Sequence, residues 1–162
     1  MTAKDVVQAL AKQGNVDDAV FLQRFFKTGK GQYSEGDQFI GVRVPATRAV
    51  CRQFKDLPLS EVSKLLDSPV HEHRLAGAII LANAYPRADE AKRQKIFDLY
   101  LAKSYAGRIN NWDIVDTIKK GDPSTTLDIA DILLHDTHDL IYAIEKLPLQ
   151  QKHHYMQLKQ NS

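Results

Sequence analysis

The sequence contains very little cysteine and tryptophan and has no long hydrophobic run. Cys51 is the only cysteine among 162 residues, so an intramolecular disulfide is impossible and a site with four thiolate ligands is excluded. No apolar stretch approaches the roughly 18 residues that a membrane span needs. The N-terminus also lacks the apolar core of a secretory signal. These absences predict a cytoplasmic protein that has no membrane segment.

The composition is that of one globular domain. Hydrophobic residues make up 43% of the chain and charged residues 26%, which is unlike a disordered or fibrous protein. A chain of 162 residues is also long enough to bury a core. We therefore expect residues 1–162 to form a single domain.

Helical signals dominate the sequence, and no segment shows sustained alternation of apolar and polar residues. Thr2 and Asn15 can begin helices, and Pro45 suits the first turn of a third. Ser68-Pro69 predicts the start of a long apolar helix that runs to about Tyr85. Further helices are expected over 60–67 and 89–103, from Asn110 or Asn111, and over 124–135, 137–146 and 149–159. The sequence therefore predicts an all-α fold, interrupted by a glycine-containing loop over 28–44.

The spacing of these helices suggests how they are arranged. Helix pairs that recur at about 40 residues are typical of HEAT-like repeats, in which antiparallel pairs stack into a curved α-solenoid. An irregular helical bundle is the alternative, because the pairs show little similarity in sequence.

Positive charge is concentrated between Arg24 and Lys55, where seven basic residues stand against two acidic ones. A local surface with this excess could meet a phosphate backbone. The alternative is a solvated helix face without a partner.

The motif His71-Glu72-His73 does not predict a metal site. It lacks the pair of histidines four residues apart that a zinc protease helix carries, and no third ligand is evident. Glu72 instead suits the positive N-terminal end of the predicted helix, in a capping role. No metal and no cofactor are expected, and Cys51 is expected to be a structural thiol because no base is placed to activate it.

The segment 110–116 combines the only tryptophan with an acidic residue one helical turn later. Trp112 and Asp116 would share one face of a helix. An indole face beside a carboxylate suits a cationic planar group, through stacking, cation–π attraction and Coulomb stabilisation. The alternative is a core tryptophan beside a surface or capping aspartate.

Several motifs, taken in order, resemble the AlkD-type DNA alkylation-repair family of alkylpurine DNA glycosylases, which are built from HEAT-like repeats. The resemblance is closest over residues 20–116. The motifs that carry it are residues 25–42, Val44-Pro45, His71-Glu72-His73-Arg74-Leu75 and Asn110-Asn111-Trp112-Asp113-Ile114-Val115-Asp116.

The resemblance implies hydrolysis of the N-glycosidic bond of cationic alkylated purines, such as N3-methyladenine and N7-methylguanine, in double-stranded DNA. Asp116 matches the family's carboxylate that stabilises the oxocarbenium-like sugar and positions a water molecule. Trp112 matches an aromatic residue that packs against the backbone of the lesion nucleotide. Phe25 falls where some relatives carry a tyrosine near the lesion. The DNA-binding residues are completed by three expected phosphate contacts: Lys27, Arg43 and Arg48.

The resemblance is interrupted after Asp116 and again near residue 141, where two family segments have no counterpart. A cleft arginine and a second cleft tryptophan of the family are lost with them, so residues 117–162 form a shortened C-terminal part. The alternative function is therefore a catalytically impaired or inactive HEAT-like module that binds DNA or another partner. A monomer or a weak dimer is expected, because a missing repeat exposes the apolar face of its neighbour.

Overall fold

The computed structural model of the protein describes residues 1–26, 28–30, 34–109 and 114. They form six α-helices: α1 (Ala3–Ala11), α2 (Val16–Phe25), α3 (Val44–Cys51), α4 (Leu59–Leu66), α5 (His71–Ala84) and α6 (Glu90–Tyr105). Short 3-10 turns follow α3 (Arg52–Phe54) and α5 (Tyr85–Arg87). In these ranges the sole strand-type pairing is a bridge between Gln38 and Val70. The all-α prediction is confirmed, whereas the curved solenoid and the single domain over 1–162 stay predictions.

The helix starts predicted at Thr2, Asn15 and Pro45 are confirmed. The side chain of Thr2 accepts from the N–H of Asp5 in a capping box, and Asn15 caps α2 by accepting from the N–H of Asp18. Pro45 lies in the first turn of α3. The helices predicted from Asn110 or Asn111 onward lie outside the described residues. None of the helices described here combines the length and the apolar character needed to cross a membrane.

The start of α5 differs from the prediction. The helix begins at His71, and Val70 is the residue before it, with no side-chain cap. Ser68 does not cap it, because its hydroxyl accepts from the N–H of Val70 and lies 2.9 Å from Nδ1 of His73. The Ser68-Pro69 signal therefore located the turn correctly but placed the first helical residue too early.

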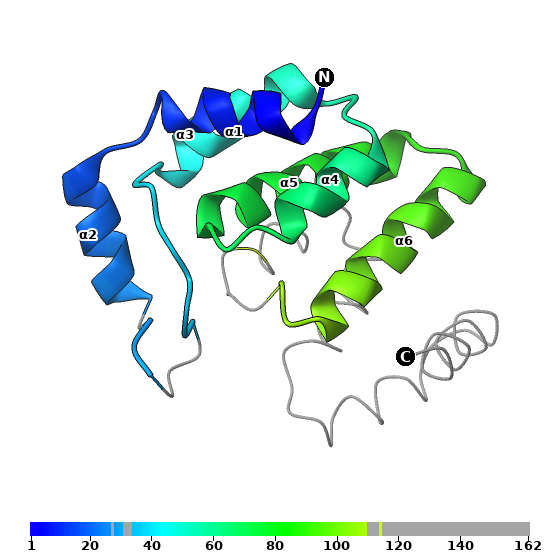
Figure 1. Cartoon of the computed structure of the whole chain (residues 1–162). Coiled ribbons are helices and arrows are strands. Elements are labelled where there is room, and N and C mark those ends of the chain that lie inside the picture. The colour runs from blue at the N-terminus through cyan, green and yellow to red at the C-terminus, as the bar shows by residue number, and fades with distance from the viewer. Residues whose placement is uncertain (27, 31–33, 110–113, 115–162) are drawn as a thin grey trace.

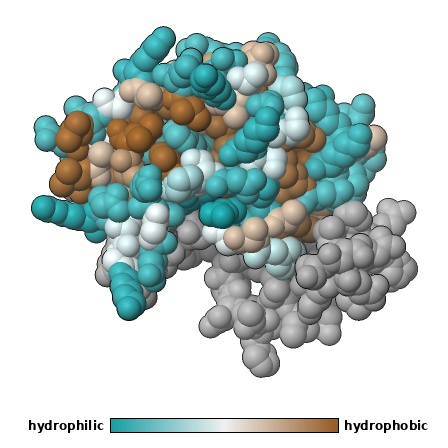
Figure 2. Space-filling view, viewed as in Figure 1, coloured by the Kyte–Doolittle hydropathy of each residue, from teal (hydrophilic) through white to brown (hydrophobic). Residues whose placement is uncertain are grey.

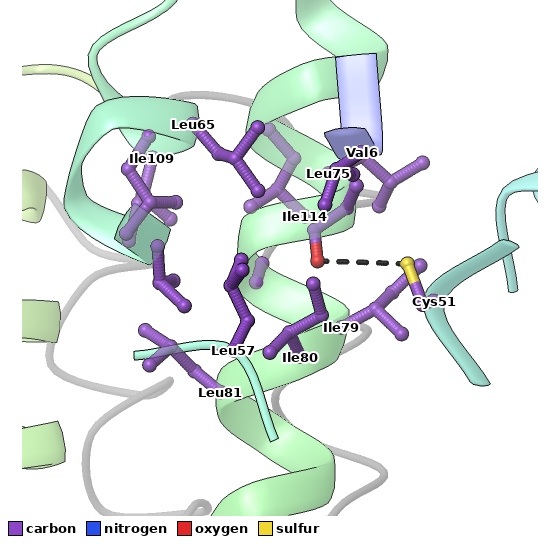
Figure 3. Packing of buried hydrophobic residues seen from close by; sticks show 14 of the residues in the cluster. Val6, Cys51, Leu57, Leu65, Leu75, Ile79, Ile80, Leu81, Ile109 and Ile114 are labelled. Atoms are coloured by element: carbon purple, nitrogen blue, oxygen red, sulfur yellow. Dashed lines mark hydrogen bonds between the residues drawn. The ribbon is translucent and has the colours of Figure 1, made fainter. Parts of the chain in front are cut away.

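Helix α5 lies at the centre of the fold, with α3, α4 and α1 packed around it and α6 beside α4 (Figure 1). Ten of its fourteen residues are buried. Gly77 allows α4 to approach closely, because a Cβ atom there would lie 3.1 Å from the side chain of Leu66. The hydrophobic core forms around this contact and extends to Ile109 and Ile114 (Figure 3).

Cys51 belongs to this core. Its thiol lies 3.7 Å from the carbonyl oxygen of Ala76, the contact dashed in Figure 3. Burial raises the pKa of the Cys51 thiol to about 12, against the opposing effect of the positive charge of Arg48. A thiol in this environment stays protonated at neutral pH, as expected of a structural cysteine.

Helix α2 stands apart from the other helices (Figure 1) and has no buried residue. The segment 34–42 leads from its end back to the turn between α1 and α2. There the N–H of Asn15 donates to the carbonyl of Ile40 at 3.1 Å. Gly41 has a φ of +75°, and a Cβ atom at this position would lie 1.9 Å from the carbonyl oxygen of Asn15. Only glycine permits the two backbones to approach so closely.

Two glycines of this segment provide a matched test of that contact. Gly36 also has a positive φ, of +83°, but a Cβ atom there would meet nothing within 4 Å. Gly36→Ala should cost about 1 kcal/mol of unfolding free energy for the left-handed backbone alone. Gly41→Ala should cost roughly 1–3 kcal/mol more, because the methyl group overlaps the backbone of Asn15. Urea unfolding of both variants measures the difference, and equal losses would contradict the close approach.

Candidate functional site

The predicted site residues fall into two groups. Trp112, Asp116 and Lys27 lie outside the described residues, so their roles stay predictions. The structure describes Phe25, Arg43 and Arg48, and it also describes Ile114 within the motif 110–116.

Phe25 lies in the last turn of α2 with 63% of its surface exposed. Its ring stacks on that of Phe21 with centroids 6.0 Å apart, and meets the edge of Phe26 at 5.1 Å. Figure 2 shows hydrophobic residues gathered over α2. We call them the apolar face of α2, which consists of Val16, Val20, Phe21 and Phe25. This exposed apolar surface makes α2 a candidate interaction site.

Arg43 lies against this face and is already paired. Its guanidinium donates to both carboxylate oxygens of Asp18, from Nη2 at 2.6 Å and from Nε at 3.0 Å. Its central carbon lies 5.9 Å from the ring centre of Phe21. The hydrogen bond and the charge of Arg43 lower the pKa of Asp18. A phosphate that binds Arg43 would therefore have to compete with an internal carboxylate.

Arg48 occupies a different environment. It is half-buried on α3, near enough to Cys51 to act on the pKa of that thiol. Of the predicted phosphate contacts that the structure describes, Arg43 is therefore the one placed beside Phe21 and the apolar face of α2.

A set of buried charges that the sequence analysis missed links segment 34–42 to the start of α5. Nη2 of Arg74 lies 2.6 Å from Oδ2 of Asp37, and both side chains are at least 92% buried. The other terminal nitrogen, Nη1, donates to the carbonyl oxygens of Ser68 and Pro69 at 3.1 and 3.3 Å. The guanidinium thus connects the loop, the turn before α5 and α5 itself.

Glu72 also acts on this loop, which corrects the predicted capping role. Its carboxylate accepts from the backbone N–H groups of Ile40, Gly41 and Val42 at 2.9–3.3 Å. The side chain points to the neighbouring segment because segment 34–42 runs beside the first turn of α5. The sequence offered one signal for this role, an acidic residue in an otherwise apolar helix, but nothing in it identified the partner.

The two histidines of the same motif point to different partners. His71 faces Asp37, with Nδ1 3.7 Å from Oδ2, whereas His73 contacts Ser68. Burial and the neighbouring Arg74 lower the pKa of His73. Among the residues that the structure describes, no three His, Cys, Asp or Glu side chains are grouped so that they could hold a metal ion.

Ile114 gives the one structural view of the motif 110–116. It is helical and 0% exposed, and it belongs to the hydrophobic core cluster drawn in Figure 3. The motif therefore contributes at least this residue to the core.

Comparison with known protein families gives a match over most of the chain. The model of a family described as DNA alkylation repair enzyme matches residues 6–121. A search of curated proteins and a search of solved structures found no match to the chain.

The buried Asp37 predicts how stability depends on pH. Burial alone would raise the pKa of Asp37, but His71 and Arg74 outweigh it and hold the pKa below the ordinary value of 3.8. The folded protein therefore binds this proton less readily than the unfolded chain. The stabilising effect of the carboxylate is complete above its ordinary pKa and is lost as the pH falls below it.

Asp37→Asn should lower the unfolding free energy by about 3 kcal/mol at neutral pH, because it leaves Arg74 buried without its carboxylate. The difference between the wild type and the variant should shrink as the pH falls from about 4 to about 2. Urea unfolding at a series of pH values measures it. A difference that stays constant over this range would contradict the assignment.

Proposed function

Because the chain belongs to the DNA alkylation repair enzyme family, we propose that it is a DNA glycosylase that removes cationic alkylated purines from duplex DNA. The substrates of this class are bases such as N3-methyladenine and N7-methylguanine. The family match covers 6–121, a range that contains both the apolar face of α2 and the motif 110–116.

The proposed reaction requires little acid catalysis from the protein. A cationic purine is a good leaving group, since the electron pair of the broken N-glycosidic bond neutralises its positive charge. Water supplies the hydroxyl group that bonds to the sugar C1′ and releases a proton. The remaining task is to stabilise the positive charge that develops on the sugar, which a fixed carboxylate does effectively in a water-excluded site.

Asp116 is the carboxylate that we assign to this task, with Trp112 against the lesion nucleotide. The burial of Ile114 supports the assignment. In the helix that the sequence predicts here, positions 112 and 116 both stand about 200° around the axis from position 114. A helix that turns position 114 into the core therefore presents positions 112 and 116 on the opposite face.

Phe25 and Arg43 are two further residues that we assign to the proposed site. The exposed ring of Phe25 suits contact with a nucleotide, because stacking on an aromatic ring is tolerant of base identity. Arg43 lies beside Phe21, whose ring stacks on that of Phe25. It can exchange its bond with Asp18 for a phosphate, which positions the duplex without reading its sequence. Lys27 and Arg48 complete the proposed backbone contacts.

A second candidate function is binding of duplex DNA without base removal. It is favoured by the single tryptophan of the chain, because the family's second cleft tryptophan and its cleft arginine have no counterpart here. Binding through phosphate contacts would weaken steeply as salt rises.

Release of the alkylated base from duplex DNA that contains N7-methylguanine is the test of the enzymatic proposal. Asp116→Asn should reduce the rate constant roughly 10²- to 10³-fold, since it removes one preorganised electrostatic group. Asp113→Asn is the matched control and should retain the activity, because position 113 falls on a different side of the predicted helix.

The outcomes separate the two candidates. Wild-type release no faster than that of Asp116→Asn would refute the glycosylase proposal. If the same preparation binds duplex DNA with a strong dependence on salt, the binding module is the function. Equal losses in both aspartate variants would contradict the role assigned to Asp116.

A further inference from the structure

Three rings form a compact cluster at the junction of α2, segment 34–42 and α5. The imidazole of His71 stacks on Phe26 with centroids 5.0 Å apart and on Phe39 at 4.8 Å. Phe26 and Phe39 are themselves stacked at 5.2 Å and 11°. Each ring comes from a different element, so the cluster joins the end of α2 to the start of α5.

The imidazole also has a polar side that the two phenyl rings lack. Its Nδ1 lies 3.7 Å from Oδ2 of Asp37, the oxygen that also receives Arg74 at 2.6 Å. The ring is therefore placed by packing against Phe26 and Phe39 and by a carboxylate that Arg74 holds. With His71 only 2% exposed, water does not compete for this arrangement.

The junction contacts the C-terminal end of helix α2, which buries no residue of its own. At its C-terminal end, the side-chain amide of Gln23 donates to the carbonyl oxygen of Asp37 at 2.9 Å. The ring of Phe26 contacts His71, and Phe25 contacts the edge of Phe26 at 5.1 Å. A continuous series of contacts thus runs from the buried imidazole to the exposed ring of Phe25.

We propose that His71 is a positioning residue: its imidazole, packed against both Phe26 and Phe39 and facing Asp37, fixes the end of α2 and with it the place of the Phe25 ring. Its effect on catalysis rests on the proposed function, whereas its effect on Phe25 does not. The aromatic face of residue 71 is what positions the Phe25 ring. A phenyl ring should therefore substitute for the imidazole, and a flexible amide should not.

Fluorine NMR tests the positioning directly. The chain has six phenylalanines, and 4-fluorophenylalanine gives each of them a line that single Phe→Leu variants assign. In His71→Gln the lines of Phe25, Phe26 and Phe39 should shift, while those of Phe54 and Phe97 stay in place. His71→Phe adds a seventh labelled ring, whose line is the one missing from the wild-type spectrum, and in this variant the Phe25 line should return to its wild-type position.

His73→Ala is the matched control. His73 lies on the same helix and contacts Ser68 rather than the ring cluster, so all six lines should keep their positions. Identical Phe25 lines in His71→Gln and His71→Phe would overturn the proposal, since the ring would then have no effect. A Phe25 line that moves equally in His73→Ala would overturn it too, because any change in α5 would suffice.

Base release provides a second and separable measurement. His71→Gln should lower kcat on the order of tenfold to 100-fold, as expected for a misplaced residue of the proposed site, and His71→Phe should restore it. The dissociation constant for unmodified duplex DNA should change less than kcat. A wild-type protein that releases no base would refute the proposed function, and the fluorine spectra would still decide the role of His71.

Discussion

The arrangement of the N-terminal half depends on the hydrogen bonds that the carboxylate of Glu72 accepts. It accepts from three successive backbone N–H groups, at Ile40, Gly41 and Val42, and so supplies the hydrogen bonds that an irregular segment beside a helix would otherwise lack. Hydrogen bonds to a charged group contribute about 1.5–3 kcal/mol each, and an unpaired buried donor costs a similar amount. Segment 34–42 can therefore be part of the folded core without being helix or strand.

The other buried contacts build on this one. With the segment held against α5, Gly41 reaches the backbone of Asn15 and sets where α2 begins. The path of segment 34–42 also brings Asp37 to Arg74 and Phe39 to His71. These contacts set where α2 ends. A helix that buries no side chain is thus fixed at both ends. Its apolar face stays exposed and is therefore accessible to a partner. The proposed function assigns DNA to this surface, in keeping with the family of the chain.

The sequence predicted those features that depend on neighbours along the chain. Thr2, Asn15 and Pro45 mark helix starts through local caps and fixed backbone angles, so they could be read without a structure. The motifs 25–42 and 110–116 likewise identified the family before any contact was known. The place of Phe25 near the lesion was expected from the resemblance alone and stays a prediction, although the structure shows that its ring is exposed.

The sequence could not show contacts between distant residues. Glu72 looked like a helix-terminal acid because position within a helix is a local property, whereas its partners lie 30 to 32 residues earlier. Asp37 and Arg74 are 37 residues apart, and no periodic pattern in the sequence predicts that they pair. Arg43 was counted as a free positive charge, although Asp18, 25 residues earlier, neutralises it. Charge counted along a sequence is therefore a poor guide to charge available on a surface.

Hydrogen exchange of the backbone amides in segment 34–42 tests most directly whether this segment is part of the core. If Glu72 holds it, the amides of Ile40, Gly41 and Val42 should exchange as slowly as those of the buried residues of α5, through global unfolding. The amide of the exposed Gly36 should exchange much faster. Exchange of all four amides at the rate of Gly36 would contradict the account, because the segment would then open independently of the fold.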